Sequence, residues 1–300
     1  MPWPQRLKWG WLVCAFLMVA LSVMGIVVSV TALIRGEWSL AAGLAGAAVL
    51  FAGLGWIGIG AGGIHTIGLS RRIMECTDEY GRGIRIPTAR SVALVFVVAL
   101  GGAGVYGLGA AGVFYLGDSS LLLPEGRSAD GNAALMGILG AVVLLVALCV
   151  GILRPRGEVR IYPSGIRRIV RRPFSPRARI LDIYRDWTDI EAVIADEMVA
   201  HSGGVDVHHP MIKLRTATPI EPGARTKFDS EHDLTIMTKM YVAEPNTLFD
   251  LLRYVDENPG SRSIIGASDA RELLNPPDLR TRLEIGRRKA AGGSAEGTAP

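Results

Sequence analysis

The sequence contains four long runs without any Asp, Glu, Lys or Arg. A bilayer core about 30 Å thick is crossed by roughly 20 apolar residues in a helix, and each run reaches that length. The chain of 300 residues is therefore predicted to be a multi-pass membrane protein. The runs are Trp9–Ile34, Trp38–Ser70, Ser91–Gly117 and Gly131–Leu153.

Ionisable groups at membrane depth are scarce as well, since His65 is the only one in these runs. Transporters, proton relays and intramembrane enzymes usually keep such groups within the bilayer. His65 could sense protons or touch a substrate, but its place near the end of its run, close to Thr66 and Ser70, favours a structural hydrogen bond. A small transporter or channel subunit is therefore the alternative function, not the leading one.

Catalytic and metal-binding patterns are not found either. Cys14, Cys76 and Cys149 share no close spacing, which excludes a disulfide framework or a zinc knuckle. No GxSxG, Walker, CxxC or kinase signature occurs, so we expect no enzymatic activity and no cofactor. Several histidines of the second half lack the spacing of a metal site and are interpreted as loop residues. They are His201, His208, His209 and His232.

The arginines and lysines next to the runs predict the orientation, because such residues remain on the cytoplasmic side. The segments outside the runs alternate between several positive charges and one. Both termini are therefore expected in the cytoplasm, with the protein in the plasma membrane. The first run is too long for the apolar region of a cleaved signal peptide, about 7 to 15 residues. The positive residues are Arg6 and Lys8, then Arg35, then Arg71, Arg72, Arg82, Arg85 and Arg90, then Arg127.

Glycine is abundant in the second and third runs, which predicts close helix packing. Gly58 and Gly62 form a GxxxG pattern, and Ala103 with Gly107 repeats the spacing with small residues. These faces are candidate seams within the helix bundle or between protomers, so a homo-oligomer is left open.

Beyond Leu153 the pattern changes to short β-like segments separated by turn residues. The linker 154–158 spans at most about 18 Å, so the first strand begins close to the headgroups. Gly165 is expected at positive φ in the first hairpin turn. Predicted strands are Val159–Tyr162, Ile166–Val170, Ala178–Tyr184, Ile190–Ile194, Met211–Thr216 and Leu234–Val242.

One amphipathic helix ends this region. Pro245 suits its first turn, apolar residues recur at helical spacing, and Asn258-Pro-Gly260 stops it. The apolar positions are Leu248, Leu251, Leu252 and Val255. The predicted domains are 1–153 (a four-helix transmembrane bundle, helices about 10–34, 39–69, 91–116 and 132–153), 154–263 (cytoplasmic and mainly β), and 264–300 (short helices and a disordered tail).

Three segments resemble bacterial PH-like domains attached to membrane helices: Glu158–Ile166, Trp187–Ile190 and Leu248–Pro259. The resemblance covers Arg156 to Ser263 and implies a seven-strand barrel capped by the helix. It also implies a binding or scaffolding module without catalytic residues. The chain departs from the compact pattern between Val199 and Asp233, where long loops are expected.

Positive charge is concentrated at the start of this domain. From Arg154 to Arg185 there are ten arginines and two acids. An arginine near an anionic leaflet gains about 1 kcal/mol, so the cluster is expected to contact membrane lipid or a protein partner. The alternative is that these arginines only enforce topology and solvate an exposed strand face. Nucleic acid is disfavoured because few aromatic residues accompany the arginines. The candidate contacts are Arg167, Arg168, Arg171 and Arg172.

Overall fold

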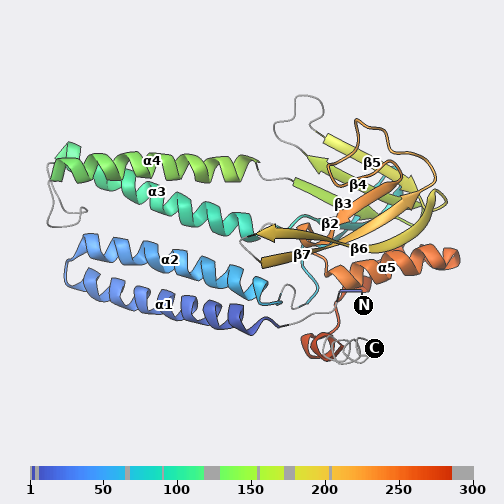
Figure 1. The fold of residues 1–300 in the computed structure, drawn as a ribbon, viewed down its shortest axis with the longest axis horizontal. Coiled ribbons are helices and arrows are strands. Elements are labelled where there is room, and N and C mark those ends of the chain that lie inside the picture. The colour runs from blue at the N-terminus through green and yellow to red at the C-terminus, as the bar shows by residue number, and fades with distance from the viewer. Residues whose placement is uncertain are drawn as a thin grey trace, which may run out of the picture. The chain divides into compact units, whose positions relative to one another are not determined.

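The structure is a computed structural model that describes residues 2–3, 7–64, 68–89, 91–117, 129–153, 156–171, 180–202 and 205–285. The chain divides into two compact units. A helix unit comprises 7–64 and 90–154, and a β unit comprises 1–6, 65–89 and 155–300. Figure 1 shows the elements of each unit.

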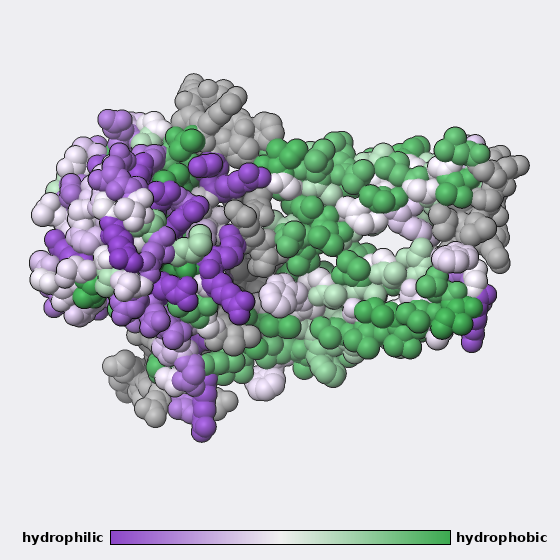
Figure 2. Space-filling model, turned by 180° about the vertical axis from the view of Figure 1, so that it is seen from behind, coloured by the Kyte–Doolittle hydropathy of each residue, from purple (hydrophilic) through white to green (hydrophobic). Residues whose placement is uncertain are grey.

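The helix unit confirms the four predicted runs. Each helix is long and apolar enough to cross a membrane. Hydrophobic side chains cover these helices, whereas hydrophilic ones dominate the surface of the β unit (Figure 2). The helices are α1 (Trp9–Ile34), α2 (Trp38–Ala61), α3 (Ser91–Gly117) and α4 (Ala129–Leu153).

The second helix ends at Ala61, so the predicted end at residue 69 is wrong. Gly63 has φ of 100°, a left-handed conformation that ends a helix and is open to glycine. Its N–H donates to Gly60 O, and the N–H of Ile64 donates to Ile59 O. These two bonds satisfy the last carbonyls of α2 and turn the chain out of the helix.

The four helices pack mainly as two antiparallel hairpins. α1 lies along α2 and α3 lies along α4, while contact between α2 and α3 is much smaller. In the first hairpin, Ser22 is buried and donates to Ala48 O at 2.8 Å. Ser29 likewise donates to Ala41 O at 2.6 Å. Small and hydroxyl residues thus bring the backbones of α1 and α2 close together.

Within the described residues, the β unit forms two antiparallel sheets. The five-stranded sheet has the order β1-β2-β3-β4-β5, and the three-stranded sheet has the order β6-β7-β8. The strands are β1 (Met74–Asp78), β2 (Gly81–Pro87), β3 (Arg156–Ile161), β4 (Gly165–Arg171), β5 (Ile180–Asp186), β6 (Ile190–Ser202), β7 (Val205–Thr216) and β8 (Asp233–Met237).

Two of these strands come from the segment between α2 and α3, which corrects the predicted domain boundary at residue 153. β2 pairs with β3, with Ile84 opposite Ile161 and Ile86 opposite Val159. The side chains of Ile84 and Ile86 are completely buried. This segment therefore belongs to the β unit because it supplies part of its core.

The strands described do not close into the predicted barrel. β5 pairs with β4, and β6 pairs with β7. Between them the chain turns at Trp187, whose indole is buried and donates to Tyr162 O at 2.9 Å. The long loops expected between Val199 and Asp233 are also partly wrong, because β6 and β7 form one long hairpin.

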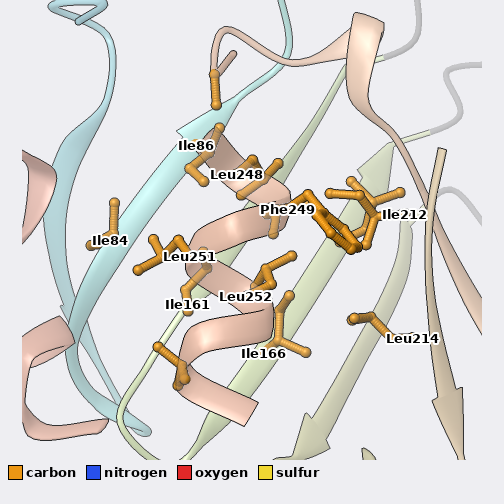
Figure 3. Packing of buried hydrophobic residues seen from close by; sticks show 14 of the residues in the cluster. Ile84, Ile86, Ile161, Ile166, Ile212, Leu214, Leu248, Phe249, Leu251 and Leu252 are labelled. Carbon is orange, nitrogen blue, oxygen red and sulfur yellow. The ribbon is translucent and has the colours of Figure 1, made fainter. Parts of the chain in front are cut away.

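The predicted amphipathic helix is confirmed as α5 (Pro245–Glu257). Glu244 caps it by accepting from Thr247 N at 2.7 Å. Figure 3 shows its apolar face against isoleucines of β2, β3 and β4 and against residues of β7. Each fully buried side chain of this kind contributes about 1.5–3 kcal/mol. Its buried apolar residues are Leu248, Phe249, Leu251, Leu252 and Val255.

The β unit continues past the predicted end at residue 263. Two 3-10 helices, η2 (Pro259–Gly266) and η3 (Ala270–Leu274), bury Ile265, Ala270 and Leu274. Residues 279–285 are helical, as expected for the following segment. The predicted disordered tail lies outside the described residues.

Candidate functional site

Arg168, a predicted lipid contact, lies on the inner face of the five-stranded sheet and is 2% exposed. Its two terminal nitrogens donate to the two carboxylate oxygens of Asp229 at 2.6 Å each. One of these nitrogens also donates to Thr235 O at 2.7 Å. A buried arginine engaged in this way holds the fold together and is not available to a headgroup, so this prediction is wrong.

Arg167 lies on the opposite, outer face, as expected for the neighbouring residue of a strand. It forms two parallel bonds to Asp182, at 2.8 and 2.7 Å, and an ion pair with Glu79 at 3.1 Å. These carboxylates raise the pKa of the Arg167 guanidinium. Only 17% of its side chain is exposed, so its charge is largely neutralised within the protein.

Arg171 is exposed at the end of β4, directly opposite Arg156 of β3 and Ile180 of β5. No acid of the described residues lies within ion-pair distance of either arginine. Ile180 is 53% exposed although it is apolar. We name Arg156, Arg171 and Ile180 the arginine rim. Arg172, the fourth candidate, lies outside the described residues, as does His65.

The arginine rim lies at the end of the sheet where the chain passes to and from the membrane helices. β2 ends at Pro87, shortly before α3 begins at Ser91, and β3 begins at Arg156, shortly after α4 ends at Leu153. The link from Leu153 to Arg156 can span at most about 11 Å. The rim is thus tethered close to the end of a membrane-crossing helix.

The other arginines of the outer face are paired. Glu158, the next outward residue of β3, accepts from Arg85 Nε at 2.6 Å and from Arg160 Nε at 2.8 Å. Arg160 also bonds Asp78 at 2.8 Å, and Tyr162 donates to the same carboxylate. Burial alone would raise the pKa of Asp78, but these bonds lower it overall. This network balances its own charge.

The end of the sheet opposite the rim carries tyrosines and exposed carboxylates. The rings of Tyr80 and Tyr184 are stacked, with centroids 3.8 Å apart and planes 13° from parallel. Tyr184 Oη donates to Asp186 at 3.2 Å. Gly165 lies beneath this pair, and a Cβ there would meet Arg185 O, so glycine is required for close approach and not for the predicted positive φ. We name Glu79, Tyr80, Asp182, Tyr184 and Asp186 the tyrosine surface.

Three of the four histidines interpreted as loop residues lie in strands instead, whereas His232 lies in a bend just before β8. His201 lies in β6, and His208 and His209 lie in β7. His208 Nδ1 is 3.2 Å from Glu197, and burial together with Lys239 lowers the pKa of His209. Within the described ranges, no group of three His, Cys, Asp or Glu side chains is placed to hold a metal ion.

Three of the four predicted packing residues lie in seams between helices. A Cβ on Gly58 or Gly62 would meet Ala15 or Leu12 of α1, and a Cβ on Gly107 would lie 2.8 Å from a carbonyl oxygen of α4. Ala103 is exposed, so it does not lie in a seam within the chain, and its alternative assignment to a seam between protomers stays a prediction. Gly104 faces α4 in its place. These seams all lie within one chain.

The sequence contains a signal for the residues that the predictions omit. Ile84 and Ile86 alternate with Gly83 and Arg85 after a turn that ends at Gly81, a pattern typical of a β-hairpin. Gly81 has φ of 96°, as such a turn requires. When the arginines of this segment are used only to predict membrane orientation, the β1–β2 hairpin is missed.

A comparison with protein-family models, with curated proteins and with solved structures finds no match to this chain. The geometry of the two ends of the outer sheet face is therefore the basis for assigning a function.

Proposed function

We propose that this chain is a non-enzymatic plasma-membrane protein whose β unit lies on the cytoplasmic side and docks on the anionic inner leaflet through the arginine rim. The observation that carries the proposal is that Arg156 and Arg171 lie opposite each other on neighbouring strands, beside Ile180, and that all three are exposed. Cations and an apolar side chain together suit the boundary between headgroups and acyl chains.

The magnitude is sufficient for docking of a tethered domain. Each arginine near an anionic surface contributes about 1 kcal/mol, so two favour the docked state by about 2 kcal/mol, or roughly thirtyfold. The undocked β unit cannot diffuse away into solution, because the covalent link to α4 holds the rim near the leaflet. Modest attraction is therefore enough.

The assembly of the β unit supports the topology. Its residues come from the N-terminal segment, from the segment between α2 and α3, and from the chain after α4. These three segments can form one unit only if they lie on the same side of the membrane that the helices cross. They also contain the largest numbers of positive residues, which favours the cytoplasmic side.

A PH-like origin of the β unit is part of the proposal. Two antiparallel sheets followed by an amphipathic helix are compatible with such a module, although the sheets described do not close. In this interpretation β2 serves as the first strand, and the hairpin of α3 and α4 is inserted between it and β3.

Docking can be tested with the full chain in lipid nanodiscs. The substitution Ile180→Cys, made after the native cysteines are replaced by serine, provides a single thiol on the rim for labelling with a bimane fluorophore. Quenching by headgroup-attached nitroxide lipid should be strong in discs with phosphatidylglycerol and weak in phosphatidylcholine alone. Arg156→Gln with Arg171→Gln should abolish the difference. Equal quenching in both lipids would contradict leaflet docking.

The matched control for this experiment is Arg253→Gln. Arg253 is an exposed arginine of α5 whose partner is Glu257. Its loss changes the net charge of the protein but leaves the rim intact, so quenching should remain sensitive to phosphatidylglycerol. Reporter fusions at both termini would test the topology separately: a periplasmic or extracellular signal would refute it.

A further inference from the structure

The last strand of the five-stranded sheet has an edge without a neighbour among the described strands. β5 pairs with β4 on one side only. An edge strand offers a row of N–H and C=O groups to which another extended segment can add. Figure 1 shows β5 at the border of its sheet.

The outward side chains of β5 alternate along this edge as Asp182, Tyr184 and Asp186. Asp186 is exposed, and the Asp182 side chain is 36% exposed. Tyr184 is half-buried and held in place by its stacking on Tyr80. A fixed aromatic ring between two carboxylates gives contact area at a low entropy cost.

The tyrosine surface, to which the outward residues of β5 belong, exposes negative charge. Glu79 is 64% exposed, whereas Arg167 lies beneath the carboxylates and is 17% exposed. Burial raises the pKa of Tyr80, and Glu79 raises it further against the opposing effect of Arg167. Burial likewise raises the pKa of Tyr184, with a further contribution from Asp186. A positively charged ligand therefore complements this end of the sheet.

We propose that β5 binds an extended segment of a partner protein as a sixth strand, and that this segment carries Lys or Arg at alternate positions. Main-chain hydrogen bonds to the edge of β5 would supply affinity. Alternate basic side chains would meet Asp182 and Asp186, and one of them could lie over Tyr184. This site uses residues other than the arginine rim and goes beyond leaflet docking.

A second copy of the chain fits this edge poorly. Antiparallel pairing of two β5 strands centred on Tyr184 would place Asp182 of each copy opposite Asp186 of the other. Like charges directly opposite one another destabilise strand pairing. The charge pattern thus selects a basic partner over self-association.

The test uses the full chain in nanodiscs of neutral phosphatidylcholine, so that leaflet docking does not contribute. The probe is a fluorescein-labelled ten-residue peptide of alternating arginine and threonine. We expect saturable binding by fluorescence anisotropy. A peptide with N-methylated arginines, which has the same charge but cannot donate those main-chain bonds, should bind about tenfold more weakly or worse.

Two charge-reversal variants separate this site from general attraction. Asp186→Lys should weaken peptide binding by about tenfold or more, whereas Glu221→Lys, at an exposed loop position, should change it less than about twofold. Equal binding of the methylated peptide, or equal losses in both variants, would overturn the proposal. So would a disulfide-linked dimer through Tyr184→Cys, made after the native cysteines are replaced by serine, because position 184 of each copy would lie opposite the other and a second copy would be the occupant.

Discussion

The buried pair of Arg168 and Asp229 offers the sharpest test of the fold. Asp229 accepts both Arg168 bonds at 2.6 Å, the Thr226 N–H at 2.5 Å and the Thr235 N–H at 2.9 Å. The two side chains are 2% and 0% exposed. Asp229→Ala leaves two backbone donors without an acceptor, and it leaves the buried guanidinium without its counter-charge, bonded to Thr235 O alone. Removing one member of a buried pair costs about 3–5 kcal/mol, which we expect here.

The double variant Arg168→Met, Asp229→Leu should recover only part of this loss. Replacing both charges by apolar groups is often neutral or stabilising. Here the N–H groups of Thr226 and Thr235 would still lack their acceptor. Each unsatisfied buried donor costs about 1–3 kcal/mol.

Hydrogen exchange of β4, measured by mass spectrometry on the full chain in detergent, reports the opening free energy of this strand. The control is Glu257→Ala, which removes an exposed pair with Arg253 and should leave the opening free energy of β4 nearly unchanged. If Asp229→Ala lowers the opening free energy of β4 by less than about 1 kcal/mol, the pair does not stabilise the fold as its geometry indicates.

The same pair sets an acid limit on stability. Burial acting alone would raise the pKa of Asp229, but its bonds from Arg168 and from two backbone N–H groups lower the pKa below its usual 3.8. A carboxyl group with a lowered folded-state pKa stabilises the fold above its unfolded-state pKa, and this contribution is lost as the pH falls through the folded-state value. Protection of β4 should therefore be constant near neutral pH and decline only below about pH 4.

Two further variants test other contacts. Gly107→Leu should destabilise the α3–α4 hairpin by about 1–3 kcal/mol, because a Cβ there meets the α4 backbone, whereas Gly109→Leu, two positions away with open space around it, should be neutral in thermal unfolding. Asn246→Ala should release Trp3, whose N–H and C=O both bond the Asn246 side chain, and unchanged protease sensitivity of the N-terminal segment would contradict this contact.

The helices and α5 could be predicted because each is determined by one dominant local signal. A run without charge has no other stable solvent than lipid, and apolar residues at helical spacing fix which face of α5 is buried. The end of α2 could not be predicted in this way because Gly63, unlike the glycines within α2, takes positive φ. Hydropathy alone does not distinguish a glycine in a helix from one that ends it.

The assignment of Arg168 as a lipid contact is wrong for a reason that the sequence could have corrected. Arg167 and Arg168 are adjacent in a predicted strand, and neighbouring side chains of a strand point to opposite faces. Only one of them can face outward. The partner that makes burial of Arg168 tolerable, Asp229, lies in a loop far along the chain. No local pattern predicts that pairing.

The arginines between α2 and α3 illustrate how one set of residues can serve topology and fold together. Arg85 binds Glu158, Arg82 binds Glu75 at 2.5 Å, and Arg72 donates to Thr88 O at 3.0 Å. Their charge favours the cytoplasmic side during insertion, whether or not it is later paired. Once β2 has joined β3, Arg85 anchors the hairpin to the rest of the β unit, while Arg82 and Arg72 make contacts within the segment itself. A topology that placed this segment on the opposite side of the membrane from the chain after α4 would instead leave the core without Ile84 and Ile86.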